Sequence, residues 1–292
     1  MDSASARKVQ ERRTLRGTVD LVGRKALLGL AVAIVATMTL LAVIGPWVAP
    51  YPPTEAVSGG QLLPPSSEHW FGTDSVGMDV FSRVIAAPRY DLTIALSATL
   101  IALGTGTPLG AVAGYYRNSL SETVMRISDL VHSFPVFILA MATVIVAGQK
   151  PISIIAVIGL VNAPIYIRLM RAEVLSLRER TFVEAAITLG EPGHKIVLRH
   201  LIPNAISPII SQASITLGIS MILTAGLSFI GAGVRVPTPE WGSMIAIGAG
   251  NVITGEWWPS FFPGLALSLT IFGFALLGDR LAVLIDPIRR DP

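Results

Sequence analysis

Six apolar runs, each long enough for a membrane-crossing helix, constrain this chain more than any other feature. A helix needs about 20 mostly apolar residues to cross the hydrocarbon of a bilayer. The composition agrees, because 52% of the 292 residues are hydrophobic and only 14% are charged, against about 25% charged in soluble domains. The sequence therefore predicts an all-α polytopic membrane protein with six transmembrane helices. The runs cover residues 26–48, 92–114, 130–148, 152–171, 205–226 and 260–279.

The first run differs from a cleaved signal peptide. Its apolar stretch is longer than the roughly 7–15 residues of a signal-peptide core. Pro50 follows Ala49 at the place where a small-residue cleavage site would have to lie. We therefore expect this run to be retained as a transmembrane helix.

The distribution of basic residues predicts the orientation, because short cytoplasmic loops carry an excess of Lys and Arg. With the N-terminus inside, 18 of the 22 Lys and Arg residues lie in inner loops and tails. The sequence therefore predicts that both termini are cytoplasmic. It divides into a basic tail (1–25), a first helix with an extracytoplasmic segment (26–91), and a core (92–288). The four basic residues left outside are Arg83, Arg89, Lys150 and Arg235.

The sequence carries no pattern for catalysis or metal binding. Cysteine is absent, which excludes disulfides and thiolate metal sites. The sequence motifs HExxH, GxSxG and GxxxxGK[ST] are also absent. We therefore expect neither an enzyme nor a bound cofactor, and any ATP hydrolysis must be carried out by a partner protein. The four histidines lack zinc-type spacing and are His69, His132, His194 and His200.

An ion-coupled secondary transporter or channel is the chief alternative class of membrane protein. Such proteins usually carry ionisable residues at mid-membrane depth. Here the charged residues nearest the apolar runs all fall at or near the ends of those runs, so a proton relay is poorly supported. These residues are Asp91, Asp129, Arg168 and Asp279.

Two external connections are expected to carry structure of their own. In residues 50–91, apolar residues recur at helical spacing from Val76 to Ile85, which predicts an amphipathic surface helix before the second span. After the fifth span, glycines and prolines forbid one continuous helix. A short interfacial or re-entrant piece is expected there, near residues 243–252.

The cytoplasmic segment 172–204 predicts two short helices joined by a sharp turn. Thr181 and Glu184 have the spacing of a capping box, with Thr181 as the N-cap and Glu184 reaching back to its backbone N–H. Gly190 suits the left-handed residue just past a helix C-terminus. Pro192 suits the first turn of the second helix, and Pro203 the first turn of the fifth span.

The first of these helices is too short to be stable alone in water. Its apolar face contains Phe182, Ala185, Ala186 and Leu189, so it must lie against another surface. One possibility is the cytoplasmic ends of the chain's own spans. The other is a groove on a separate soluble protein, where Ala185 and Ala186 are small enough to allow close approach.

The same stretch resembles the EAA loop of binding-protein-dependent ABC importer permeases. Glu184, Ala185 and Ala186 are followed by three residues and Gly190, then by nine residues, His200 and Pro203. The segments "FGTDSVGMDVFSRV", "LSFIGAG" and "PTPEWGSM" resemble the dipeptide/oligopeptide subfamily, and in particular its C-type subunit. The resemblance covers roughly residues 25–288. One departure is Met78, where the subfamily usually has Arg, which puts an ion pair from this position in doubt.

The resemblance implies a MetI-like permease fold and roles for the loop residues. Ala185, Ala186 and Leu189 would dock in a cleft of an ATPase subunit, with Glu184 as the cap and Gly190 as the turn. His200 and Pro203 would orient the second helix against the fifth span. The chain would form half of a translocation pathway in the bacterial plasma membrane.

The resemblance also implies the partners. They are a homologous B-type permease, one fused or two separate ABC ATPases that bind the ATP and Mg²⁺, an extracytoplasmic peptide-binding protein, and membrane lipid. No nucleic-acid partner is expected. Peptide is the expected substrate, while nickel, glutathione or another small solute remain alternatives within the same subfamily. The substrate-contacting residues stay undefined.

Overall fold

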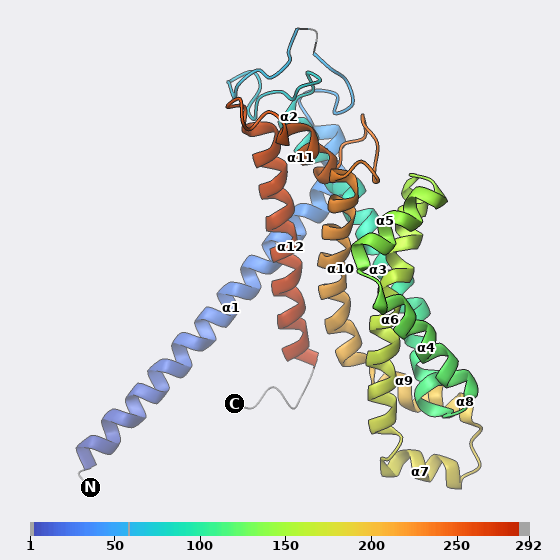
Figure 1. The fold of residues 1–292 in the computed structure, drawn as a ribbon. Coiled ribbons are helices and arrows are strands. Elements are labelled where there is room, and N and C mark those ends of the chain that lie inside the picture. The colour runs from blue at the N-terminus through green and yellow to red at the C-terminus, as the bar shows by residue number, and fades with distance from the viewer. Residues whose placement is uncertain (1–2, 58, 286–292) are drawn as a thin grey trace.

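The computed structural model describes residues 3–57 and 59–285, with side chains placed from residue 26 to residue 278. Throughout these residues the regular elements are helices. Figure 1 shows that the long helices other than the first run side by side between two ends, while the N-terminal half of α1 (Ser3–Val48) diverges from them. Helices α2 (Val80–Ala86) and α11 (Trp241–Ala249) lie at one end and α7 (Thr181–Thr188) at the other. Asp279 and residues 286–288, which the sequence prediction included, lie outside the part whose side chains are placed.

Five helices are each long and apolar enough to cross a membrane. They confirm five of the six predicted spans, with ends shifted by a few residues. The first predicted span forms the second half of α1, whose helical backbone also includes most of the predicted tail. The helices are α1 (Ser3–Val48), α3 (Pro88–Tyr115), α6 (Pro151–Leu177), α10 (Ile206–Phe229) and α12 (Trp258–Ile285).

The remaining predicted span, 130–148, is not one straight helix. It includes the end of α4 (Ser119–Ser133) and all of α5 (Val136–Ala147), which meet at an angle of 95°. Pro135 lacks a backbone N–H and disfavours helical geometry at the residue before it. Phe134 is accordingly extended, with φ −88° and ψ 141°. Neither helix alone is long and apolar enough to cross a membrane, and the two together reach that length and hydropathy.

Helices α3 and α6 make the most extensive helix–helix contact, and three glycines on one face of α3 permit their close approach. A Cβ at Gly106 would lie 2.5 Å from the backbone oxygen of Ala163, and a Cβ at Gly110 would lie 2.5 Å from that of Ile167. At Gly114 a Cβ would lie 2.9 Å from Cβ of Val174. Small residues four apart let helix backbones approach closely in membranes, where packing replaces the hydrophobic effect. This stripe therefore sets the distance between α3 and α6.

The end of the molecule that carries α2 and α11 is a layer built on one buried arginine. Arg83 lies in α2 (Val80–Ala86) and its side chain is fully buried. Its Nη1 donates to the backbone oxygens of Pro53 (2.8 Å) and Pro237 (3.0 Å), and its Nε lies 3.9 Å from an Asp74 carboxylate oxygen. Arg83 thus joins the segment before α2 to the segment between α10 and α11.

Helix α2 and its neighbour begin at acidic caps. The carboxylate of Asp79 accepts the backbone N–H of Ser82 at 2.7 Å, so α2 starts at Val80 rather than near Val76 as predicted. The short piece predicted near 243–252 is α11 (Trp241–Ala249), where the Glu240 carboxylate accepts two backbone N–H groups at 2.8 and 2.7 Å. Burial raises the pKa of Glu240 because the charged form loses hydration.

The surroundings of Met78 show what replaces the arginine that the subfamily usually has at this position. The side chain is buried, and its Sδ lies 2.7 Å from Nη1 of Arg83. Position 78 therefore makes a sulfur contact to a cation and no ion pair. The charge of Arg83 is compensated by Asp74 instead.

Candidate functional site

The segment that links α6 to α10 contains four short helical pieces. They are α7 (Thr181–Thr188), α8 (Gly193–Lys195), a π-helix η1 (Ile196–Leu201) and α9 (Ile202–Asn204). Helix α7 lies at the end of the molecule opposite α2 and α11 (Figure 1). We call residues 178–205 the α7 loop.

The predicted capping box at the start of α7 is wrong. The N-cap is Arg180, whose backbone is extended at φ −89° and ψ 147°, and no side chain caps the helix. Thr181 is therefore already the first helical residue. A capping-box glutamate must stand three residues after the N-cap, and that position belongs to Val183. Glu184 is exposed one residue further on, where its backbone N–H donates to the Arg180 oxygen at 3.3 Å.

The predicted turn at Gly190 is confirmed. Its φ is +77°, a conformation that residues with a Cβ rarely adopt. The Gly190 N–H donates to the Ile187 oxygen at 2.9 Å, and the Glu191 N–H donates to the Ala186 oxygen at 3.0 Å. These two bonds form a Schellman motif, which satisfies carbonyls at the helix end that otherwise lack partners.

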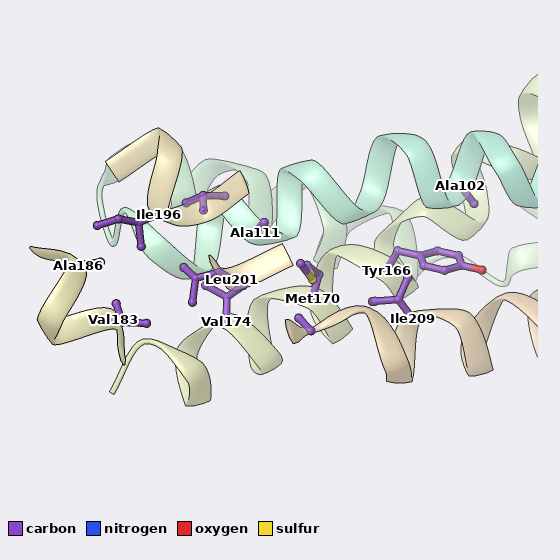
Figure 2. Close-up of a cluster of buried hydrophobic side chains, with 12 residues drawn as sticks. Ala102, Ala111, Tyr166, Met170, Val174, Val183, Ala186, Ile196, Leu201 and Ile209 are labelled. Atoms are coloured by element: carbon purple, nitrogen blue, oxygen red, sulfur yellow. The ribbon is translucent and has the colours of Figure 1, made fainter. Parts of the chain in front are cut away.

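Helix α7 has two apolar faces, and they have different surroundings. Val183 and Ala186 point inward, with 0% and 6% of their surface exposed, and belong to the buried cluster that contains Ile196 and Leu201 (Figure 2). The outward residues include Leu189, which is 86% exposed, and Ala185. The helix therefore rests on its own chain through one face and leaves the other open.

This division corrects one predicted docking residue. Ala186 was expected beside Ala185 on a docking surface, but it is buried within its own chain. Ala186 lies on the inward face because residues three apart on a helix, such as Val183 and Ala186, share a face, while adjacent residues do not. Phe182 (39% exposed), Ala185 and Leu189 are three and four residues apart and form the outward surface, while Ile187 (52%) is exposed on another side of the helix. We call Phe182, Ala185 and Leu189 the outward face of α7.

His200 and Pro203 lie in the second half of the α7 loop. His200 Nε2 is 2.8 Å from a Glu191 carboxylate oxygen, and the backbone oxygen of His200 accepts from the Asn204 side chain at 2.6 Å. Pro203 was expected in the first turn of the fifth span. It lies instead in α9, which ends at Asn204, and Ala205 separates α9 from α10, which begins at Ile206. Pro192 is likewise the N-cap of α8 rather than a residue of its first turn.

Sequence reasoning missed Glu191, because its partner is nine residues away and only the fold joins them. It also missed the contacts that hold the loop to the spans, among them the Arg178 side chain, which donates to the backbone oxygen of Tyr115 at 2.9 Å. Within the described residues, no group of three or more His, Asp and Glu side chains is placed to hold a metal ion.

Comparison with known proteins identifies the family. Residues 106–291 match the model described as binding-protein-dependent transport system inner membrane component. This chain belongs to that family of transport permeases. Residues 24–65 of the permease also match the model for the N-terminal TM domain of oligopeptide transport permease C, which agrees with the C-type resemblance of the sequence.

Curated relatives cover nearly the whole permease. It is 37% identical over 254 residues to the probable D,D-dipeptide transport system permease protein DdpC of Escherichia coli (strain K12), covering 87% of this chain and 85% of the relative. It is also 37% identical to the dipeptide transport system permease protein DppC of Alkalihalophilus pseudofirmus, covering 87% and 83% of the two chains. The glutathione transport system permease protein GsiD of Pectobacterium atrosepticum is 36% identical over 223 residues, covering 76% of this chain and 74% of GsiD.

The fold is that of MetI-like permeases. An inward-facing structure of the MetNI methionine ABC transporter matches 70% of this chain and 96% of its own chain, with a TM-score of 0.56 and 19% identity. At that identity the likeness concerns the fold alone. The permease is therefore an all-helical, multi-pass membrane component of a binding-protein-dependent ABC importer.

Proposed function

We propose that this permease transports peptides, and that the outward face of α7 docks on a partner ATPase to couple transport to ATP hydrolysis. The observation that carries the coupling role is an apolar surface left exposed on a short helix at the end of the molecule. Leu189 alone is 86% exposed there. Burying such a side chain is worth about 1.5–3 kcal/mol, which favours a protein partner.

An ATPase is the partner of matching chemistry. The permease lacks a phosphate-binding GxxxxGK[ST] sequence, so ATP and Mg²⁺ must be bound elsewhere in an ATP-driven importer. A helix that presents a few apolar anchors suits a groove on the partner. The Schellman turn at Gly190 and the inward contacts of Val183 and Ala186 support this role, because they hold the outward face in one orientation before docking.

Peptide as the substrate is supported by the relatives named for dipeptide and D,D-dipeptide transport. The relative named for glutathione transport favours glutathione as the second candidate. Selection among such solutes rests with the extracytoplasmic binding protein, which we propose as a further partner. A homologous B-type permease would complete the pathway.

The test of this assembly is purification of the tagged permease from its native membrane in mild detergent. We expect a sister permease and one or two ABC ATPases to co-purify. The ATPase should stay bound because docking buries the apolar outward face of α7. Removal of the ATPases by urea washing should then expose a cysteine placed by Ala185→Cys to maleimide. A stable permease that carries no ATPase under these conditions would contradict the proposal.

We also propose that both termini face the cytoplasm, on the basis of the 18 inner and four outer basic residues. Because the natural chain has no cysteine, single cysteines can report the topology on intact cells. An impermeant maleimide should label Gln61→Cys, an exposed position of the predicted external segment, and should spare Ser119→Cys, an exposed position between the second and third predicted spans, until the cells are permeabilised. The reverse labelling pattern would overturn the orientation.

A further inference from the structure

We propose that Glu191 is a positioning residue that transmits movement of α7 to the fifth span through its contact with His200. This inference rests on the proposed coupling role of α7. The Glu191 carboxylate lies 2.8 Å from His200 Nε2 and spans the turn between the two halves of the α7 loop.

Glu191 holds both sides of the turn. Its backbone N–H donates to the Ala186 oxygen at 3.0 Å and closes the C-terminus of α7. Its side chain reaches η1 through His200. A displacement of the end of α7 therefore displaces the backbone of Glu191 and, through one side chain, the imidazole of His200.

From His200 the connection continues toward the membrane. The His200 oxygen accepts from the Asn204 side chain at 2.6 Å, and Asn204 is the last residue of α9. Only Ala205 separates α9 from α10. Two polar contacts thus link Glu191, at the end of α7, to Asn204, which lies two residues before the first residue of α10.

Helix α7 also packs against η1 through apolar side chains. Val183 and Ala186 pack in a cluster with Ile196, Val197 and Leu201, and such packing has no fixed direction. The turn itself adds no packing, since a Cβ at Gly190 would meet no atom within 4 Å. The contact between Glu191 and His200 therefore adds a directional link between the end of α7 and η1 to this packing.

This contact can be removed without unfolding the protein. The two side chains are partly exposed, at 22% for Glu191 and 37% for His200, and ion pairs with such exposure add little to global stability. Variants of the pair should therefore insert and assemble normally. Their effect should be confined to transport.

The experiment compares variants of the complete importer in proteoliposomes, measuring uptake of radiolabelled dialanine per ATP hydrolysed. Glu191→Ala and His200→Ala should each lower this ratio roughly 2- to 30-fold, the range for residues that carry coupling between sites. Glu191→Gln should stay close to wild type, because an amide can still hydrogen-bond an imidazole. The matched control is Glu179→Ala, which removes a more exposed ion pair with Arg117 at 3.9 Å and should leave the ratio unchanged.

A double variant and an exchanged pair separate this role from a local structural defect. Glu191→Ala with His200→Ala should cost no more than either single change, since both remove the same contact. Exchange of the two residues, Glu191→His with His200→Glu, should recover most of the ratio. Additive losses in the double variant, or a wild-type ratio in Glu191→Ala, would overturn the inference.

Leu189→Glu in the same preparation distinguishes this inference from the proposed function. If Leu189→Glu abolishes coupling while Glu191→Ala does not, docking stands and the role of Glu191 is wrong. If Leu189→Glu leaves coupling intact, the docking role of α7 is wrong, and the inference about Glu191 falls with it.

Discussion

Gly110→Val should prevent the permease from accumulating as a folded protein, whereas Gly104→Val on the same helix should be tolerated. A Cβ at position 110 would lie 2.5 Å from the Ile167 oxygen and 3.0 Å from the Ile167 Cα. Both are backbone atoms, so neither can move without moving α6. Overpacking typically costs about 1–3 kcal/mol, and we expect at least the upper end of that range here.

Gly104 is the matched control for this prediction. It lies in α3 and a Cβ there would meet no atom within 4 Å, so the same substitution adds bulk only at the surface. Both changes have the same small effect on the intrinsic helix tendency of α3. The measurement is the yield and thermal melting of the detergent-solubilised protein by size-exclusion chromatography. Equal yields and melting temperatures for the two variants would show that the α3–α6 contact is not as close as the structure has it.

The approximate places of five spans were predictable because they depend on local composition. Runs of about 20 apolar residues have few stable alternatives in a bilayer. The bend between α4 and α5 was missed although its cause, Pro135, is visible in the sequence. Hydropathy averages over a window and does not register one residue that lacks a backbone N–H.

Among the residues of the α7 loop, those whose role depends on local conformation were also predicted better than those whose role depends on packing. Gly190 was predicted correctly because its role depends on its own backbone conformation, which only a few residue types adopt easily. Thr181 and Ala186 were assigned wrongly because their roles depend on where α7 begins and which face meets η1. A shift of one residue, from Thr181 to Arg180 as the N-cap, was enough to remove the capping box.

The layer around α2 and α11 was the least predictable part. The sequence counts Arg83 as an external charge, but the folded chain buries it with carbonyls from two distant connections. Charge patterns reveal the side of the membrane and not the burial of a single side chain. A buried arginine requires acceptors that no local sequence pattern specifies.

The strongest effect on transport is expected from Leu189→Glu. The leucine is 86% exposed and lies at the C-terminal end of α7, so the change leaves the fold of the permease intact. In the docked complex the glutamate would have to lose its hydration in an apolar groove, which is costly for an unpaired charge. We therefore expect at least a tenfold loss of coupled uptake, corresponding to about 1.4 kcal/mol or more of docking free energy.

The matched control is Leu198→Glu, which makes the same change at another exposed leucine of the α7 loop. Leu198 lies in η1 and is 62% exposed, so a carboxylate there stays hydrated. It does not belong to the outward face of α7. Uptake and binding-protein-stimulated ATPase activity should be measured on the same proteoliposomes for both variants. We expect Leu189→Glu to lose uptake and stimulation together while Leu198→Glu keeps both, and equal activity of the two would show that docking does not use this face.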